Sequence, residues 1–158
     1  MTIAENIARI RANMAAAARE AGRDPKEILL VGASKMNDAA ACREAVAAGI
    51  DALGENRVQE MVQKLEQHAY DGAPLHFIGH LQRNKVRKAL EHFTLIHAVD
   101  SLRLAQFMDA VAQETGKRPR ILLEVNVGDE DSKFGFSPET LEREWPELAA
   151  LDHLEIAG

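Results

Sequence analysis

The sequence predicts an α/β fold in which short parallel strands alternate with helices, and two observations support this prediction. Short apolar runs alternate along the chain with longer segments in which apolar residues recur at helical spacing. Such alternation implies parallel strands joined by helical crossovers. The clearest strand, Ile121–Val127, is a nearly continuous apolar run, as a strand covered on both faces requires.

The individual elements follow from local signals. The first helix, Ile3–Gly22, has an apolar stripe that includes Ile7 and Ile10, and it ends at a glycine. The last helix starts after Ser137, an N-cap residue that is followed by Pro138 at the first helical position. The other expected helices are Asp38–Ala48, Arg57–His68, Gln82–Glu91 and Leu102–Thr115. The expected strands are Ile28–Ala33, Ala52–Gly54, His76–Gly79, Leu95–Val99, Ile121–Val127 and Leu154–Ala157.

Two architectures fit this series, an open doubly wound sheet and a (β/α) barrel. The first strand-to-helix turn lacks the glycine-rich fingerprint of dinucleotide-binding folds and carries Lys35 instead, which favours the barrel. A TIM-type barrel closes with eight strands, and six are counted here. Residues 1–158 are therefore expected to form a single barrel domain that is incomplete at its C-terminal end.

Composition narrows the possible functions. Of the 158 residues, 46% are hydrophobic and 28% are charged, which is typical of a globular chain. The formal net charge of −6 argues against nucleic acid as a partner, because a phosphate-binding surface needs concentrated basic residues. The single cysteine, Cys42, excludes an internal disulfide and is expected to be buried. The chain shows no membrane-span pattern and no signal-peptide pattern, so we expect no membrane partner and a cytoplasmic location.

Lys35 is the residue that most suggests a function, since it follows the strand Ile28–Ala33. In (β/α) barrels the chemistry lies at the C-terminal ends of the strands. A lysine at that position can simply reach into water, or a partly desolvated amine can form an imine with a carbonyl compound. Polar and glycine-containing turns expected at the same edge favour the second interpretation. Their chemically useful residues are Asn56, His80, Asp100, Asn126 and Lys133.

The segment HFIGHLQRNK contains two histidines four residues apart, as in helical zinc sites. Because His76 falls in an expected strand and no third ligand is evident, we do not expect a metal site. The basic residues of 83–88 are interpreted as a solvated helix face, although an anionic partner would also explain them. Glu55 is interpreted as a structural acid that pairs with Arg57 or Arg83.

Four segments resemble motifs of the YggS/PROSC family, the pyridoxal phosphate homeostasis proteins, in order and in spacing. They are ASK at 33–35, GENRVQE at 54–60, HFIGHLQRNK at 76–85 and NVGDEDSKFGF at 126–136. The resemblance covers essentially the whole chain. The third motif combined with GEN is highly specific, whereas SK alone would carry no weight.

The resemblance implies a fold-type III barrel, similar to the N-terminal domain of alanine racemase. It implies that the chain binds pyridoxal 5′-phosphate (PLP) as an imine of Lys35. It also implies a role in PLP and amino-acid homeostasis without robust enzymatic turnover. By the same resemblance, Asn56 and His76 would lie in or beside the cofactor site, and Lys133 matches a family lysine near its mouth. Asn126, at a strand end, is assigned to the same site.

The sequence departs from the family pattern in two places. Family members often continue SKTKP, whereas Met36 follows Lys35 here; this changes the turn but should not prevent imine formation. Family chains also continue well beyond this length, with strands seven and eight, the loops that bind the cofactor phosphate, and an arginine facing the pyridine nitrogen. We therefore expect weak phosphate retention and self-association through the open barrel edges.

Other functions stay open at this point. A PLP-dependent racemase or decarboxylase of fold-type III would use the same lysine, but it would need a second acid/base group on the opposite cofactor face, for which this chain has no room. An imine-forming aldolase without cofactor is disfavoured by the family motifs. A fourth alternative is that the 158-residue chain by itself binds no ligand tightly.

Overall fold

The computed structural model describes residues 1–128 and 134–158. The chain forms two compact units, and each is described by itself. The N-terminal unit comprises Met1–Glu55 and Gln59–Leu75. The C-terminal unit comprises Asn56–Val58 and His76–Gly158.

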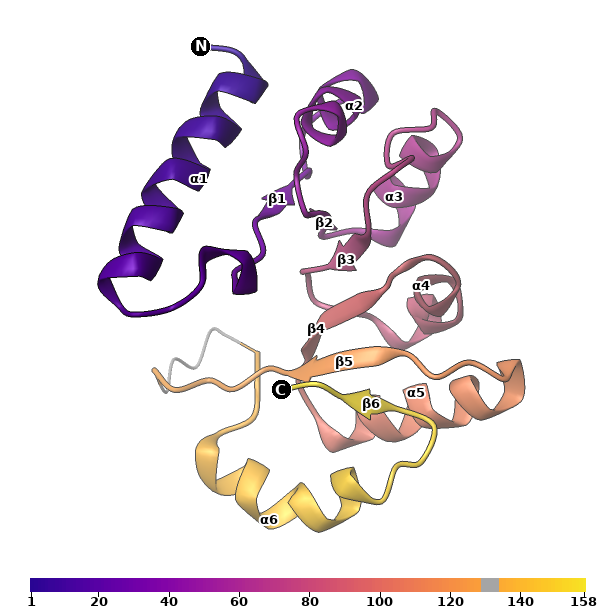
Figure 1. Cartoon of the computed structure of the whole chain (residues 1–158). Coiled ribbons are helices and arrows are strands. Elements are labelled where there is room, and N and C mark those ends of the chain that lie inside the picture. Colours follow the sequence, from indigo (N-terminus) through magenta and orange to yellow (C-terminus); the bar gives the residue numbers. More distant parts are fainter. Residues whose placement is uncertain (129–133) are drawn as a thin grey trace. The chain divides into compact units, whose positions relative to one another are not determined.

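The N-terminal unit contains one pair of parallel strands and three helices (Figure 1). β1 (Val31–Ala33) pairs with β2 (Ala52–Glu55) in a register that sets Gly32 opposite Leu53. The helices are α1 (Ile3–Glu20), α2 (Ala39–Ala47) and α3 (Val58–Leu65), and the 3-10 turn η1 (Pro25–Glu27) precedes β1. α1 starts with a capping box between Thr2 and Glu5, each of whose side chains accepts the other's backbone N–H.

The C-terminal unit contains parallel strands joined by helices. β3 (Leu75–Phe77) pairs with β4 (Leu95–Val99), β4 pairs with β5 (Arg120–Leu123), and β5 pairs with β6 (Glu155–Ile156). The connecting elements are η2 (Arg83–Lys85), α4 (Val86–His92), α5 (Leu102–Thr115) and α6 (Pro138–Ala149). In Figure 1, β4, β5 and β6 lie side by side.

The strand order follows the chain, β1-β2-β3-β4-β5-β6. A helix lies between successive strands, and the registers given above are parallel. This is the order of a (β/α) barrel, whereas a doubly wound sheet reverses its order at a switch point. The order has two ends, β1 and β6, as expected for an incomplete barrel with six of eight strands. The predicted fold class is confirmed.

The observed bounds match the sequence prediction for β4 and α5, whereas β1 begins at Val31 instead of Ile28 and β5 ends at Leu123 instead of Val127. β1 is shorter than predicted, and its residues are half-buried or exposed, although the apolar run Ile28–Ala33 is typical of a buried strand. β1 stands at one end of the strand order, which leaves it a single neighbour. β5 ends at Leu123. Beyond it, Val125 forms an isolated bridge with Phe136, which belongs to no named strand.

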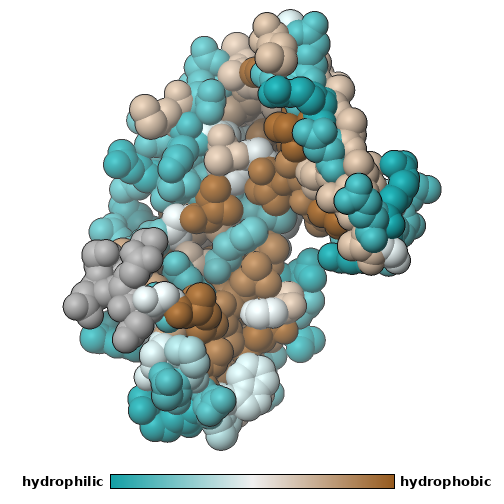
Figure 2. Space-filling model, turned by 90° about the vertical axis from the view of Figure 1, so that its left-hand side faces the viewer, coloured by the Kyte–Doolittle hydropathy of each residue, from teal (hydrophilic) through white to brown (hydrophobic). Residues whose placement is uncertain are grey.

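Apolar side chains form a core within each unit. The most deeply buried in the C-terminal unit include Ile96, Val99, Met108, Ile121 and Leu148. Apolar surface also remains visible on the face drawn in Figure 2. The large apolar side chains that are exposed, within the described ranges, are Met1, Ile10, Leu29, Met36, Val127, Phe134 and Trp145. None of the helices that the structure describes is both long enough and apolar enough to cross a membrane.

Candidate functional site

Lys35 lies in a tight turn directly after β1. The turn is closed by a hydrogen bond of 3.1 Å from the backbone N–H of Asn37 to the carbonyl of Ser34. Met36 has a φ of 62°, a left-handed conformation that costs a non-glycine residue about 1–2 kcal/mol. A strained residue of this kind persists only where its surroundings hold it. Interactions around the turn must therefore fix its conformation.

The amine of Lys35 is accessible. Its side chain is exposed, and the part of the chain that the structure describes offers its amine no hydrogen-bond or ion-pair partner. The backbone carbonyl of Lys35 accepts a hydrogen bond from Nδ2 of Asn37 at 3.2 Å. The partial desolvation expected for this lysine was wrong, because the turn lies at the surface. An exposed amine that no carboxylate of the described residues engages can meet a small carbonyl compound.

A buried carboxylate is bonded to the same turn. Glu55, the last residue of β2, has no exposed surface. Its Oε1 accepts hydrogen bonds from Oγ of Ser34 at 2.7 Å, from the hydroxyl of Tyr70 at 2.9 Å, and from Nζ of Lys64 at 2.5 Å. Lys64 also donates to the backbone carbonyl of Ser34 at 2.7 Å. We call Ser34, Glu55, Lys64 and Tyr70 the Glu55 cluster; all four belong to the N-terminal unit.

Opposite charges compensate one another in the Glu55 cluster. Lys64 is only 8% exposed and faces the Glu55 carboxylate directly. Burial, together with the hydrogen bond to Glu55, raises the pKa of the Tyr70 hydroxyl far above its usual value, so that this group stays a neutral donor. Burial likewise raises the pKa of the neighbouring Cys42 thiol, which is buried as the sequence predicts. Oε2 of Glu55 is buried without a hydrogen-bond partner among the described residues.

Sequence reasoning missed two members of this cluster, Lys64 and Tyr70. The ion-pair partner found for Glu55 is Lys64, so the expected pairing with Arg57 or Arg83 was wrong. Lys64 follows Met61 by three residues in α3, and Met61 is fully buried. Residues three apart share one face of a helix, so a lysine on the apolar side of α3 was the signal available in the sequence.

Asn56 follows β2 and belongs to the C-terminal unit, where its backbone touches that of Gly79. A Cβ added to Gly79 would lie 2.4 Å from the carbonyl oxygen of Asn56, so only glycine permits this contact. The side-chain oxygen Oδ1 of Asn56 is buried and has no hydrogen-bond partner within the described residues. A buried polar atom without a partner is rare in native proteins and points to a missing ligand or water.

His76 in β3 is paired with a second histidine. Its Nδ1 lies 3.0 Å from Nε2 of His97 in β4, and the ring centroids are 5.1 Å apart. Burial lowers the pKa of both histidines, and for His76 the neighbouring His97 and Arg120 contribute in the same direction. The sequence analysis did not single out His97. Its place beside His76 depends on the register between β3 and β4.

His80, just beyond β3, faces a carboxylate. Its Nδ1 lies 3.0 Å from Oδ2 of Asp100, and its ring stacks on Phe134 with a centroid distance of 3.8 Å. His80 and Asp100 are thus brought together just beyond the ends of their strands, as expected from the sequence. The described residues contain no cluster of three or more histidine, cysteine or acidic side chains suited to a metal ion.

Asn126 lies after β5. Its backbone N–H donates to the carbonyl of Phe136 at 2.8 Å, and Gly135, with a φ of 115°, lies against the same segment. The backbone on either side of residues 129–133 is thereby held together. Lys133, which the sequence assigns to the cofactor site, lies outside the described residues.

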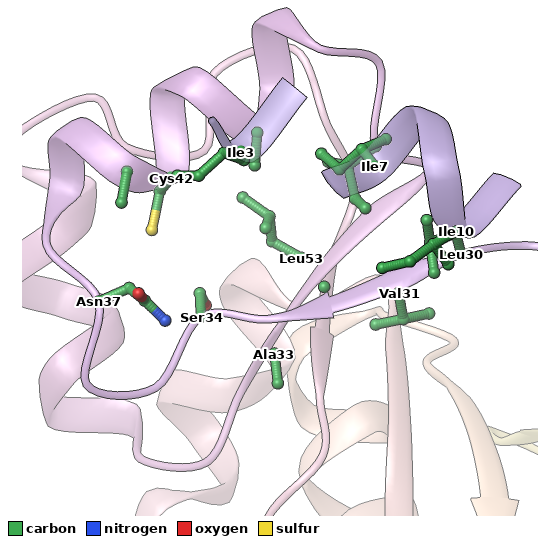
Figure 3. Close-up of a pocket in the computed structure, with 14 residues that line it drawn as sticks. Ile3, Ile7, Ile10, Leu30, Val31, Ala33, Ser34, Asn37, Cys42 and Leu53 are labelled. Atoms are coloured by element: carbon green, nitrogen blue, oxygen red, sulfur yellow. The ribbon is translucent and has the colours of Figure 1, made fainter. Parts of the chain in front are cut away.

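A cavity of about 250 Å³ lies beside Ser34 in the N-terminal unit. In Figure 3, Ser34 and Asn37 lie at one end of it and Ile10 lies at the other. Its walls come from α1, β1, α2 and β2, and none of its lining residues is charged. Lys35 is not part of the lining. This apolar cavity is therefore no candidate for binding an anion.

The predicted site residues divide between the two units. Lys35 belongs to the N-terminal unit, where the structure joins its turn to the Glu55 cluster. Asn56, His76 and Asn126 belong to the C-terminal unit, each with the surroundings described above.

The family of the chain follows from its similarity to known proteins. The family model described as alanine racemase, N-terminal domain, matches residues 6–158. A protein of Pseudomonas aeruginosa named pyridoxal phosphate homeostasis protein is 42% identical over 158 residues, covering 99% of this chain and 68% of that protein. The chain belongs to the pyridoxal phosphate homeostasis protein family. The family member from Escherichia coli (strain K12) is 38% identical over 161 residues, with the same coverage of 99% and 68%.

Solved structures agree with membership in this family. PipY of Synechococcus elongatus without PLP has a TM-score of 0.87 at 40% identity and is matched over 99% of this chain and 69% of its own. PipY with PLP bound has a TM-score of 0.84 at 39% identity, with coverage of 99% and 68%. An alanine racemase of Clostridium difficile, 19% identical with a TM-score of 0.69, shares the fold over 83% of this chain and 35% of its own.

Proposed function

We propose that the chain binds PLP, holds it as an imine of Lys35, and serves PLP and amino-acid homeostasis inside the cell. The observation that carries this proposal is an exposed amine, without a partner in residues 1–128 and 134–158, at the C-terminal end of a barrel strand. The PLP-bound structure of PipY, 39% identical to this chain, supports it. The cofactor supplies an aldehyde, with which a lysine amine forms a C=N bond as water leaves.

The other proposed site residues fit such a ligand to different degrees. Asn56 offers a buried oxygen that lacks a protein partner. His76 is engaged by His97 and would act from beside the cofactor. Asn126 and Lys133 are assigned to the same site from their places near the end of the fifth strand. A phosphate dianion prefers several backbone N–H donors at a loop or helix N-terminus, and the cavity beside Ser34 is apolar, so we propose weak phosphate retention.

We further propose that the chain lacks robust catalytic activity. The names of its relatives support a homeostatic role. The alternative, a racemase or decarboxylase of fold-type III, needs a second acid/base group on the opposite cofactor face. Turnover of an added amino acid by the PLP-loaded chain would favour that alternative.

The remaining proposals concern organisation and location. We propose one barrel domain over residues 1–158, located in the cytoplasm, with no nucleic-acid or membrane partner; the net charge of −6 supports the absence of a nucleic-acid partner. We also propose self-association through the open edges. β1 stands at an end of the strand order, and Leu29 before it is 64% exposed.

A spectroscopic titration tests the proposed function. An imine of PLP absorbs visible light differently from the free aldehyde, so titration of the chain with PLP should produce a saturable band. Lys35→Ala should abolish the band and leave the urea unfolding curve unchanged, because the Lys35 side chain is exposed. A band of equal strength in Lys35→Ala would overturn the assignment.

A further inference from the structure

The Glu55 cluster joins two strand ends at a high cost in desolvation free energy. Moving charges out of water costs several kcal/mol per ion, and a buried ion pair often adds no net stability compared with apolar packing. Glu55 is nevertheless fully buried, and Lys64 is 8% exposed. The position of the cluster suggests another reason for it, because it lies where β1 gives way to the Lys35 turn.

Ser34 is the residue through which the cluster reaches this turn. Its carbonyl accepts hydrogen bonds from Nζ of Lys64 at 2.7 Å and from the N–H of Asn37 at 3.1 Å. Its hydroxyl lies 2.7 Å from Oε1 of Glu55 and 3.1 Å from the carbonyl of Gly54, to which its own N–H also donates. Every polar atom of Ser34 is thus engaged, and Lys35 is attached directly to it.

The opposite end of the same strand pair is built differently. There Oδ2 of Asp51 accepts the N–H of Leu30 at 2.6 Å, and Oδ1 lies 3.0 Å from Arg11. The Arg11 and Asp51 side chains are 36% and 26% exposed, so this pair joins the strands without a buried charge. Hydrogen bonding to Arg11 lowers the pKa of Asp51. Strand pairing alone therefore does not require the buried arrangement found beside Lys35.

The two lysines near Ser34 also differ in availability. Lys64 is buried and donates to two oxygens, whereas the Lys35 amine is exposed and has no partner among the described residues. An amine must present its lone pair to attack a carbonyl carbon. Lys64 is therefore suited to hold the turn, and Lys35 to react.

We propose that the Glu55 cluster positions Lys35, by fixing the Ser34 carbonyl and hydroxyl so that the turn holds the Lys35 backbone, from which the amine extends, in one conformation. This inference rests on the proposed function. In the reaction served, the amine nitrogen adds to the aldehyde carbon, both amine protons leave, and the aldehyde oxygen departs as water. Glu55 and Lys64 act through Ser34 and touch no reacting atom.

The test compares three variants of the 158-residue chain. Glu55→Gln with Lys64→Met removes both charges together, so that no lone charge stays buried. Tyr70→Phe removes one donor to Glu55 and keeps the ion pair. Asp51→Asn is the matched control, since it weakens the opposite end of the same strands. Two quantities are measured. One is the rate of amide hydrogen exchange at Asn37. The other is the equilibrium constant for addition of pyridoxal to Lys35, followed by the absorbance of the imine, and reduction locates the imine on the chain.

We expect the double variant to exchange the Asn37 amide at least tenfold faster and to bind pyridoxal at Lys35 at least tenfold more weakly. Tyr70→Phe should change both in the same direction by a smaller factor, which keeps the test decisive if the double variant does not fold. Asp51→Asn should lower the unfolding midpoint without changing either quantity. Unchanged exchange and binding in folded cluster variants would overturn the inference.

Failure of the proposed function gives a different result. If the unmodified chain adds no pyridoxal at Lys35, the function is wrong. The Asn37 exchange rates still decide whether the cluster orders the turn.

Discussion

The Glu55 cluster of the N-terminal unit and the histidine pair of the C-terminal unit each place a buried polar side chain, Glu55 or His76, on a strand. Glu55 is fully buried and forms an ion pair with Lys64, so opposite charge compensates for its burial. His76 instead lies against a second histidine, His97. Burial lowers the pKa values of both, which favours the neutral form of each ring. Two imidazolium rings 3.0 Å apart would repel each other.

The two groups should therefore be sensitive to different changes, the Glu55 cluster to the loss of one partner and the histidine pair to acid. A compensated ion pair tolerates a modest change of pH but not the loss of one partner. A neutral histidine pair is instead disrupted by protons, because two charged rings in contact would repel each other. The two also differ in place, since the Glu55 cluster lies at the strand end that carries Lys35, whereas the histidines lie within β3 and β4.

The largest effect is expected from Lys64→Met. Removing one partner leaves the Glu55 carboxylate buried without its counter-charge, which should lower the free energy of unfolding by about 3–5 kcal/mol. Urea unfolding at neutral pH measures this. Arg11→Met, which breaks the partly exposed pair with Asp51, is the control and should cost about 1 kcal/mol or less. Equal losses in both variants would contradict the distinction between the two pairs.

A pH effect of intermediate size is expected from the histidine pair. The folded pKa values lie below the value near 6.5 of an unfolded chain, so the unfolded state binds more protons in this range. The stability contribution is complete above about pH 6.5 and is lost as the pH falls through the folded pKa values. Urea unfolding at pH 7.5 and pH 5 should therefore show a smaller acid-induced loss in His76→Gln than in the unmodified chain.

The control for this prediction is His68→Asn, at an exposed histidine with a φ of 55°, a conformation that asparagine tolerates. It should leave the acid-induced loss unchanged. An identical loss in His76→Gln and the unmodified chain would show that the buried pair does not respond to acid.

The smallest effect is expected at the Lys35 turn itself. Met36 is 95% exposed and has a positive φ, so Met36→Gly should relieve backbone strain without loss of packing. The greater freedom of glycine in the unfolded chain offsets part of this gain, leaving about 0.5 kcal/mol of added stability. Met36→Ala keeps the Cβ and should give no gain. A loss of stability in the glycine variant would show that the turn is not strained.

The local signals of the sequence were sufficient for much of the fold. The helical spacing of apolar residues places α5, and Ser137 with Pro138 starts α6, because these signals are local to one stretch of chain. The position of Lys35 after a strand could be predicted for the same reason. The exposure of β1 could not, since it depends on which strand lies at its second edge.

The polar partners were the harder part of the site to predict. Lys64 reaches Glu55 from the next helix, and His97 reaches His76 through the register of two strands. Such contacts depend on how helices and strands pack against one another. A single residue on one face of an element does not show which side chain of another element it will meet. The resemblance to the family supplied the cofactor and the lysine proposed to bind it, but not the charged groups that we propose hold its turn in place.

The central claim, that Lys35 carries the cofactor, is tested most directly by borohydride reduction of the PLP-treated chain, followed by peptide mapping. Reduction converts the imine to a stable secondary amine and marks the lysine involved. We expect the label on Lys35 and none on Lys64, whose amine is buried and engaged by Glu55 and Ser34. Label on Lys85 or Lys133, with Lys35 unmodified, would contradict the account.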